Sequence, residues 1–153
     1  MLLLVMLAWG GYRLSLVLFP QPTLLLPWDP ACDLAAGPCS TRLPAGGSVT
    51  FEIEPRPIPV VQPLRLHVRL ESLPADEVEV DFSGIGMNMG YNRVRLQSVE
   101  PGRYQGQGML PVCVRARMDW EAEVLISTSQ GLLAVPYRFA TLRPGSSPPI
   151  TPP

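Results

Sequence analysis

The chain has 153 residues, of which 46% are hydrophobic and 16% charged, and its formal net charge is −1. This content is too apolar for an intrinsically disordered chain, and the near-neutral charge excludes the basic footprint typical of nucleic-acid binding. A hydrophobic beginning and a proline-rich end leave room for one domain of about a hundred residues. The 19 prolines argue against long helices after the N-terminal segment.

Residues 1–19 form a mostly apolar segment in which Arg13 is the only charged side chain. A helix of about 20 residues is long enough to cross a bilayer core, so this segment predicts a transmembrane helix that acts as an anchor. Arg13 would cost roughly 2.5 to 3.5 kcal/mol there unless it snorkels or a partner helix shields it. A cleaved signal peptide is the alternative, but the basic leader and a nearby small-x-small site are missing.

Residues 20–47 are expected to be a connector rich in proline and glycine, and they contain Cys32 and Cys39. A short, turn-rich loop closes a disulfide easily, and such a bond fits an oxidising compartment outside the cytoplasm. The alternative is a reduced pair that binds metal, although no second pair or nearby histidine completes a site. Cys113 is left as the odd thiol.

Residues 48–141 contain short runs in which apolar and polar residues alternate, as is typical of half-buried strands. The runs are 48–54, 64–70, 78–82, 93–97, 103–107, 120–126 and 135–139. Turn residues separate them and no helical stretch intervenes. We therefore predict an all-β fold, namely an immunoglobulin-like antiparallel β-sandwich of about seven strands behind the N-terminal helix. Residues 142–153 should form a disordered, proline-rich tail.

The glycine-rich segment 83–92 contains two methionines that are difficult to explain as core residues. If its backbone is extended, Met87 and Met89 project to the same side and could bind one ion. Soft sulfur ligands select Cu(I) and bind it without losing a proton. Further sulfur is available from Met109, Cys113 and Met118. The candidate metal ligands are therefore Met87 and Met89, completed by Cys113 or Met109.

Each of these residues also has a structural explanation. Met87 and Met89 could plug the open end of a sandwich, because a flexible side chain fills irregular gaps. An unpaired cysteine such as Cys113 is often a small buried hydrophobe. His67, the only histidine, alternates with two arginines on the polar side of its run and should face solvent.

Three segments carry a resemblance to a known family. They are GMNMGYNRVRL at 86–96, GRYQGQGMLP at 102–111 and MDWEAEV at 118–124. This order of an M-x-M turn, a G-x-Y-x-G strand and a tryptophan that opens the next strand resembles the YtkA-like/FixH-like periplasmic domain group. The resemblance covers roughly residues 64–139, and Met87 and Met89 match its methionine turn. It implies a small immunoglobulin-like periplasmic domain, linked to copper supply or cytochrome oxidase assembly.

These observations together predict a membrane-anchored, extracytoplasmic accessory domain that binds Cu(I). The resemblance places it at the bacterial inner membrane with a single span, and it implies a membrane protein complex as partner, such as a respiratory oxidase or its assembly factors. No histidine lies near the turn, which restricts such a site to Cu(I). The alternative is a metal-free assembly module, with Arg13 paired inside the bilayer to an acid of the partner.

An enzyme is not expected. Nucleophilic catalysis needs a base within hydrogen-bond reach of the nucleophile, and only Cys113 with His67 could supply such a pair. An oxidising compartment disfavours a permanent catalytic thiol. The glycines of the chain match neither a phosphate-binding loop nor a dinucleotide fingerprint.

Overall fold

The structure is a computed structural model that describes residues 1–18, 24–112 and 114–143. One helix and ten strands follow one another in this part of the chain. Their bounds are α1 Leu2–Leu18, β1 Leu24–Leu25, β2 Cys39–Arg42, β3 Ser48–Glu54, β4 Leu64–Glu71, β5 Glu77–Gly84, β6 Arg93–Arg95, β7 Gln97–Glu100, β8 Arg103–Gly108, β9 Arg117–Thr128 and β10 Gly131–Leu142.

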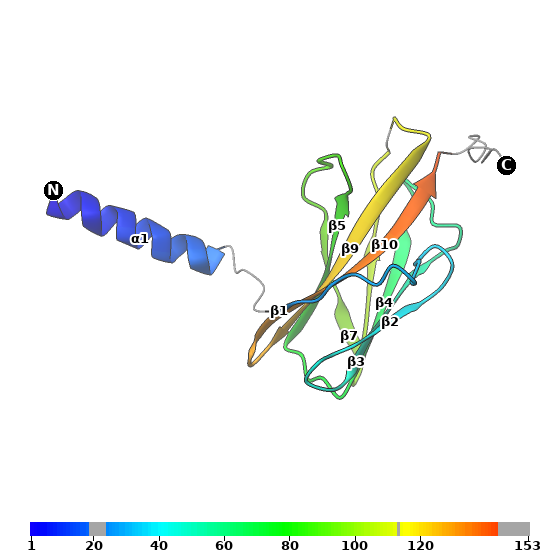
Figure 1. Cartoon of the computed structure of the whole chain (residues 1–153), viewed down its shortest axis with the longest axis horizontal. Coiled ribbons are helices and arrows are strands. Elements are labelled where there is room, and N and C mark those ends of the chain that lie inside the picture. Colours follow the sequence, from blue (N-terminus) through cyan, green and yellow to red (C-terminus); the bar gives the residue numbers. More distant parts are fainter. Residues whose placement is uncertain (19–23, 113, 144–153) are drawn as a thin grey trace.

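The strands form two five-stranded sheets that face each other as a sandwich (Figure 1). Sheet A has the order β1-β10-β9-β5-β6, and sheet B has the order β2-β3-β4-β8-β7. Neighbouring strands are antiparallel except β1, which pairs parallel with β10. The seven predicted runs all coincide with strands, and the run 93–97 is divided between β6 and β7. The prediction of a β-sandwich is thereby confirmed.

The core lies between the sheets and is built from the alternating apolar positions. In β3, for example, Val49, Phe51 and Ile53 are fully buried, because successive side chains of a strand point to opposite faces. Tyr137 of β10 crosses from sheet A to sheet B, where its ring centroid lies 5.7 Å from that of Phe51. Its hydroxyl donates a hydrogen bond of 3.0 Å to the carbonyl oxygen of Val49. Burial raises the pKa of Tyr137 to about 12.

The chain passes from sheet A to sheet B at Leu96. On one side of this residue β6 pairs with β5, and on the other side β7 pairs with β8. Leu96 itself is buried in the core. A Cβ atom at Gly106 of β8 would lie only 2.5 Å from Cδ2 of Leu96, so the missing side chain at Gly106 makes room for the crossing.

The stretch expected to be a connector contributes to the sandwich. It supplies the edge strands β1 and β2, and it buries Leu26, Leu34 and Leu43 against the core. Cys32 and Cys39 form the predicted disulfide, with Cα atoms 5.8 Å apart. A two-residue parallel strand has no visible alternation, which is why β1 escapes a search for periodic patterns.

The helix α1 covers 17 residues, and its described large apolar side chains are exposed. At 1.5 Å per residue it is about 25 Å long, whereas a bilayer core is about 30 Å thick. Within the described residues, no helix combines the length and the apolar content needed to cross a membrane. In place of the predicted transmembrane helix, the described residues form an apolar helix of 17 residues that is shorter than a membrane span. Arg13 lies over the ring of Trp9, with its Cζ atom 5.1 Å from the ring centroid.

Candidate functional site

The two methionines predicted as ligands lie in residues 85–92, which connect β5 to β6 and are called the methionine turn here. Gly86 and Gly90 adopt positive φ angles of 76° and 80°, a conformation that glycine accepts without a steric penalty. The side chain of Asn88 accepts a hydrogen bond of 2.9 Å from the amide of Gly90. These residues are exposed, whereas Met87 and Met89 are partly buried and pack against the core. The two thioethers therefore share the inner side of the turn.

A third methionine meets the turn above Gly84, the last residue of β5. A Cβ atom at Gly84 would lie 2.4 Å from Cε of Met118 and 2.8 Å from Cγ of Met89. The side chains of Met89 and Met118 thus occupy the space that a side chain at Gly84 would take. Met118 is 2% exposed and lies near the start of β9, on the inner face of sheet A.

Of the other two predicted ligands, Met109 and Cys113, the structure describes only Met109. Met109 is 47% exposed, although its backbone carbonyl accepts a hydrogen bond of 2.9 Å from the side chain of Asn92 in the methionine turn. The segment that contains Met109 is therefore joined to the turn by this hydrogen bond, while Met109 itself is about half exposed. Figure 1 shows the turn after β5 and the loop before β9 at the same end of the sandwich. Cys113 lies outside the described residues.

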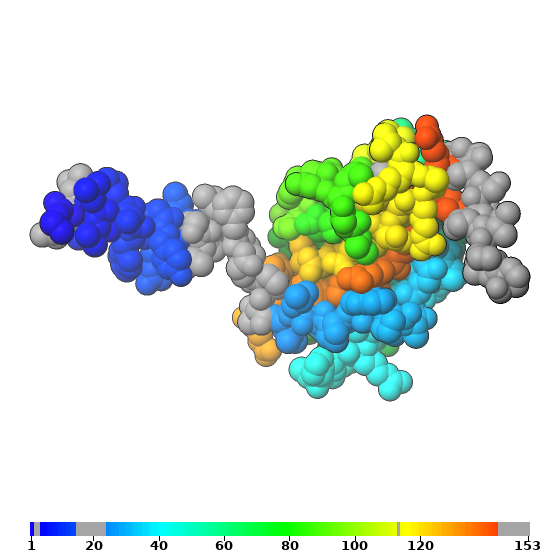
Figure 2. Space-filling view, turned by 45° about the horizontal axis from the view of Figure 1, so that its top comes forward, coloured from blue at the N-terminus to red at the C-terminus, as the bar shows by residue number. Residues whose placement is uncertain are grey.

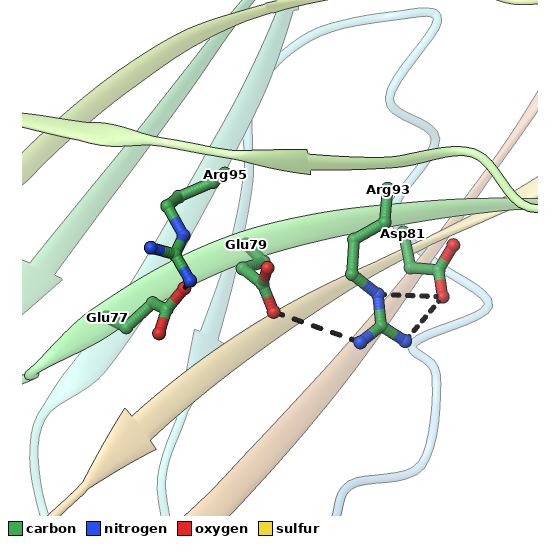
Figure 3. A network of polar contacts seen from close by, with 5 residues as sticks. All are labelled: Glu77, Glu79, Asp81, Arg93 and Arg95. Carbon is green, nitrogen blue, oxygen red and sulfur yellow. Dashed lines mark hydrogen bonds and ion pairs between the residues drawn. The ribbon is translucent and has the colours of Figure 1, made fainter. Parts of the chain in front are cut away.

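An ion-pair ladder fixes the strand that leaves the methionine turn. Figure 3 shows the guanidinium of Arg93 on β6 between two carboxylates of β5. Its Nη2 atom lies 2.8 Å from Oδ2 of Asp81, and its Nη1 atom lies 3.8 Å from Oε2 of Glu79. Arg95 pairs in the same way with Glu77. The ladder holds β6 on β5 and so fixes both arms of the turn.

The charges of this ladder also shift two pKa values. Burial alone would lower the pKa of Arg93, but the hydrogen bond and the charge of Asp81 outweigh it and raise that pKa. Glu123 of β9 lies directly opposite Asp81 in the strand register. Burial, and then the negative charges of Glu121 and Asp81, raise the pKa of Glu123.

His67 lies on the outer face of sheet B, as its alternation predicted. Its side chain is 32% exposed, and its Nε2 atom lies 3.4 Å from Oε2 of Glu54. In the part of the chain that the structure describes, no three His, Cys, Asp or Glu side chains come together as a metal site.

The sequence marks Met118 as a further source of sulfur, but it does not predict that the side chains of Met118 and Met89 share the space above Gly84. The inward-facing residues of two strands, β5 and β9, do point to this arrangement. Val78, Val80, Phe82 and Gly84 form one inward series, and Met118, Trp120 and Ala122 begin another. The register places Gly84 opposite Trp120, next to Met118. An inward position without a side chain beside an inward methionine predicts that the methionine fills the gap.

The chain matches no family model, no curated protein and no solved structure.

Proposed function

We propose that this chain is a membrane-anchored, extracytoplasmic domain that binds Cu(I) at the methionine turn and serves as a non-catalytic accessory protein. The observation that carries the proposal is the meeting of Met89 and Met118 over Gly84, with Met87 on the same inner side of the turn. Three methionine side chains, two from the turn between β5 and β6 and one from the start of β9, thus lie at one end of the sandwich. The resemblance to the YtkA-like/FixH-like group and its immunoglobulin-like fold supports the same proposal.

The chemistry of thioethers suits this ion. Thioether sulfur is a soft, neutral donor, so it favours Cu(I) and needs no deprotonation before it binds. Met87 and Met89 provide the first two ligands. Met118 is better placed than Met109 as the third, because its Cε atom and Cγ of Met89 both lie beside Gly84, while Met109 is 47% exposed. Cys113 is retained as a candidate fourth ligand.

The proposed location rests on the N-terminal segment and on the disulfide. The described large apolar side chains of α1 are 59–70% exposed, and an apolar surface of this kind is stabilised by lipid or by a partner helix. The disulfide between Cys32 and Cys39 fits an oxidising compartment. We place the sandwich in the periplasm, held at the bacterial inner membrane by residues 1–19. Its partner would be a membrane protein complex, such as a respiratory oxidase or its assembly factors.

Competitive titration tests the copper site. The full chain in lipid nanodiscs is titrated with Cu(I) under reducing conditions against a chromogenic Cu(I) chelator. We expect Met87→Leu/Met89→Leu to weaken Cu(I) binding at least tenfold and Met118→Leu to weaken it as well. Met6→Leu, which removes an exposed thioether of α1, is the matched control and should leave the affinity unchanged. Equal affinities in the wild type and the double variant would end the proposal.

A metal-free assembly module is the second candidate, and a specific feature favours it. Exposed apolar side chains lie in the methionine turn and in the loop before β9 at the same end of the sandwich (Figure 1), among them Tyr91 at 82%, Val112 at 66% and Val114 at 84%. Exposed apolar side chains of this kind are typical of a surface that binds another protein. In this version Arg13 pairs inside the bilayer with an acid of the partner complex. Arg13→Leu should then leave the sandwich folded but abolish co-purification with that complex, and retained co-purification would contradict this version.

A further inference from the structure

An apolar hollow lies at the end of the sandwich where the chain arrives from α1. Its volume is about 210 Å³, and no charged side chain is among the residues that line it. The main apolar contributions come from Leu24, Leu43, Pro44, Ala45, Leu73 and Leu132. They belong to β1, to the turn between β2 and β3, to the segment after β4 and to the tip of the β9–β10 hairpin. The hollow is therefore a surface built jointly by both sheets.

Exposed leucines continue the hollow onto the surface. Leu24 is 46% exposed and its neighbour Leu25 is 59% exposed, although both belong to a strand. Single exposed leucines are normal, but a contiguous apolar group around a hollow marks a contact surface. The charged side chains near the hollow include Arg42, Glu71 and Asp76, which are all exposed, and Nε of Arg69 lies 3.8 Å from Oε1 of Glu71.

The length of the chain fixes where this surface lies relative to α1. The helix ends at Leu18 and β1 begins at Leu24, so even a fully extended connection spans only about 20 Å. Figure 2 shows the orange residues at the start of β10 on the side of the domain next to α1, and the red residues at its end on the opposite side. Leu24 pairs with Leu133 near the start of β10. Any surface that holds α1 therefore comes within reach of the apolar hollow.

We propose that the apolar hollow and its flanking leucines contact the bilayer surface, and that this contact orients the sandwich on the membrane. The proposal rests on the proposed membrane attachment of residues 1–19. A bilayer is favoured as the occupant because the short connection keeps this apolar hollow, which has no charged side chain in its lining, close to α1, whose described large apolar side chains are exposed. The methionine turn then lies at the far end of sheet A, about 30 Å away along β10, because nine steps of about 3.4 Å lead from Leu133 to Leu142.

Site-specific fluorescence in vesicles tests this orientation. The environment-sensitive fluorophore NBD is attached to Ala45→Cys, at the rim of the hollow, in the full chain with Cys113→Ser. The matched control is the same label at Val114→Cys, an exposed position at the methionine end. Both proteins are reconstituted into phosphatidylcholine vesicles with and without nitroxide-labelled lipid. We expect blue-shifted emission and severalfold stronger nitroxide quenching for the label at position 45 than for the label at position 114.

A second variant shows whether the leucines make the contact. Adding Leu25→Glu should reduce the quenching of the label at position 45, while tryptophan fluorescence and flotation with the vesicles stay unchanged. Flotation with equal, weak quenching at both positions overturns the inference but keeps the membrane attachment. Failure to float with the vesicles overturns the attachment itself and the inference with it. Shielding of position 45 without vesicles, increasing with protein concentration, would identify contact between copies and also overturn the inference.

Discussion

Replacing Tyr137 with phenylalanine deletes a hydroxyl that joins the two sheets. Tyr137 is 4% exposed, and its hydroxyl donates a 3.0 Å hydrogen bond to the carbonyl oxygen of Val49. The phenylalanine ring would keep the packing on Phe51 but leave the carbonyl without this donor. Loss of a buried hydrogen bond of this kind costs about 1–2 kcal/mol, so we expect Tyr137→Phe to lower the free energy of unfolding by that amount at neutral pH.

The same hydroxyl makes stability depend on pH in the alkaline range. Burial raises the pKa of Tyr137 from 10.0 to about 12, and each pKa unit corresponds to about 1.4 kcal/mol. Because the pKa of the folded state is the higher one, this stabilisation is fully present below pH 10 and is lost as the pH rises through about 12. The loss amounts to about 2–3 kcal/mol. At neutral pH the wild type should therefore have a higher free energy of unfolding than Tyr137→Phe. At the alkaline end of the range it should have a lower one.

Urea unfolding followed by the fluorescence of the buried Trp120 measures both effects when it is repeated across the alkaline range. Tyr91→Phe is the matched control, because Tyr91 is 82% exposed and its replacement should leave the unfolding free energy nearly unchanged. The reasoning is refuted if the wild type and Tyr137→Phe lose stability in parallel as the pH rises. It is equally refuted if Tyr137 titrates near its ordinary pKa in a spectrophotometric titration.

Three further predictions follow from particular contacts. Glu123→Gln should raise the unfolding free energy at neutral pH by up to about 1 kcal/mol, because it removes the like charge opposite Asp81. Because the pKa of Glu123 is raised in the folded state, its protonated form stabilises the fold below pH 4.5, and this stabilisation is lost as the pH rises. The stability advantage of Glu123→Gln should therefore vanish in unfolding measurements at acid pH. An advantage that does not change with pH would contradict the like-charge explanation. Gly106→Ala should destabilise the chain by about 1–3 kcal/mol in urea unfolding, since its Cβ atom would collide with Leu96. Gly37→Ala, which meets open space, is its control, and equal stabilities would show that the crossing tolerates a side chain. Reduction of the Cys32–Cys39 disulfide should lower the unfolding free energy by about 2–3 kcal/mol, and identical urea midpoints with and without reductant would refute this estimate.

The sequence alone determined the identity and the faces of most strands. Alternation in β3, β4 and β5 distinguishes inward from outward residues, because side chains of a strand point in turn to opposite faces. The short loop between Cys32 and Cys39 was enough to predict their bond. All of these properties are local, so a single segment carries the information. For Met87 and Met89 the same periodicity applied only if the backbone was extended; the structure has a turn there, with Gly86 and Gly90 at positive φ, and both side chains pack against the core.

Only the tertiary structure decided which segments meet. The crossing at Leu96 interrupts a run that looks continuous in sequence, because the choice between sheets depends on β5 and β8 as partners. The parallel pairing of β1 is too short to leave a pattern. The placement of Met89 and Met118 on either side of the space above Gly84 depends on the register of β5 with β9, which sets Gly84 beside the start of β9. Strand register is a property of two distant segments packed together, and no periodicity within either segment encodes it.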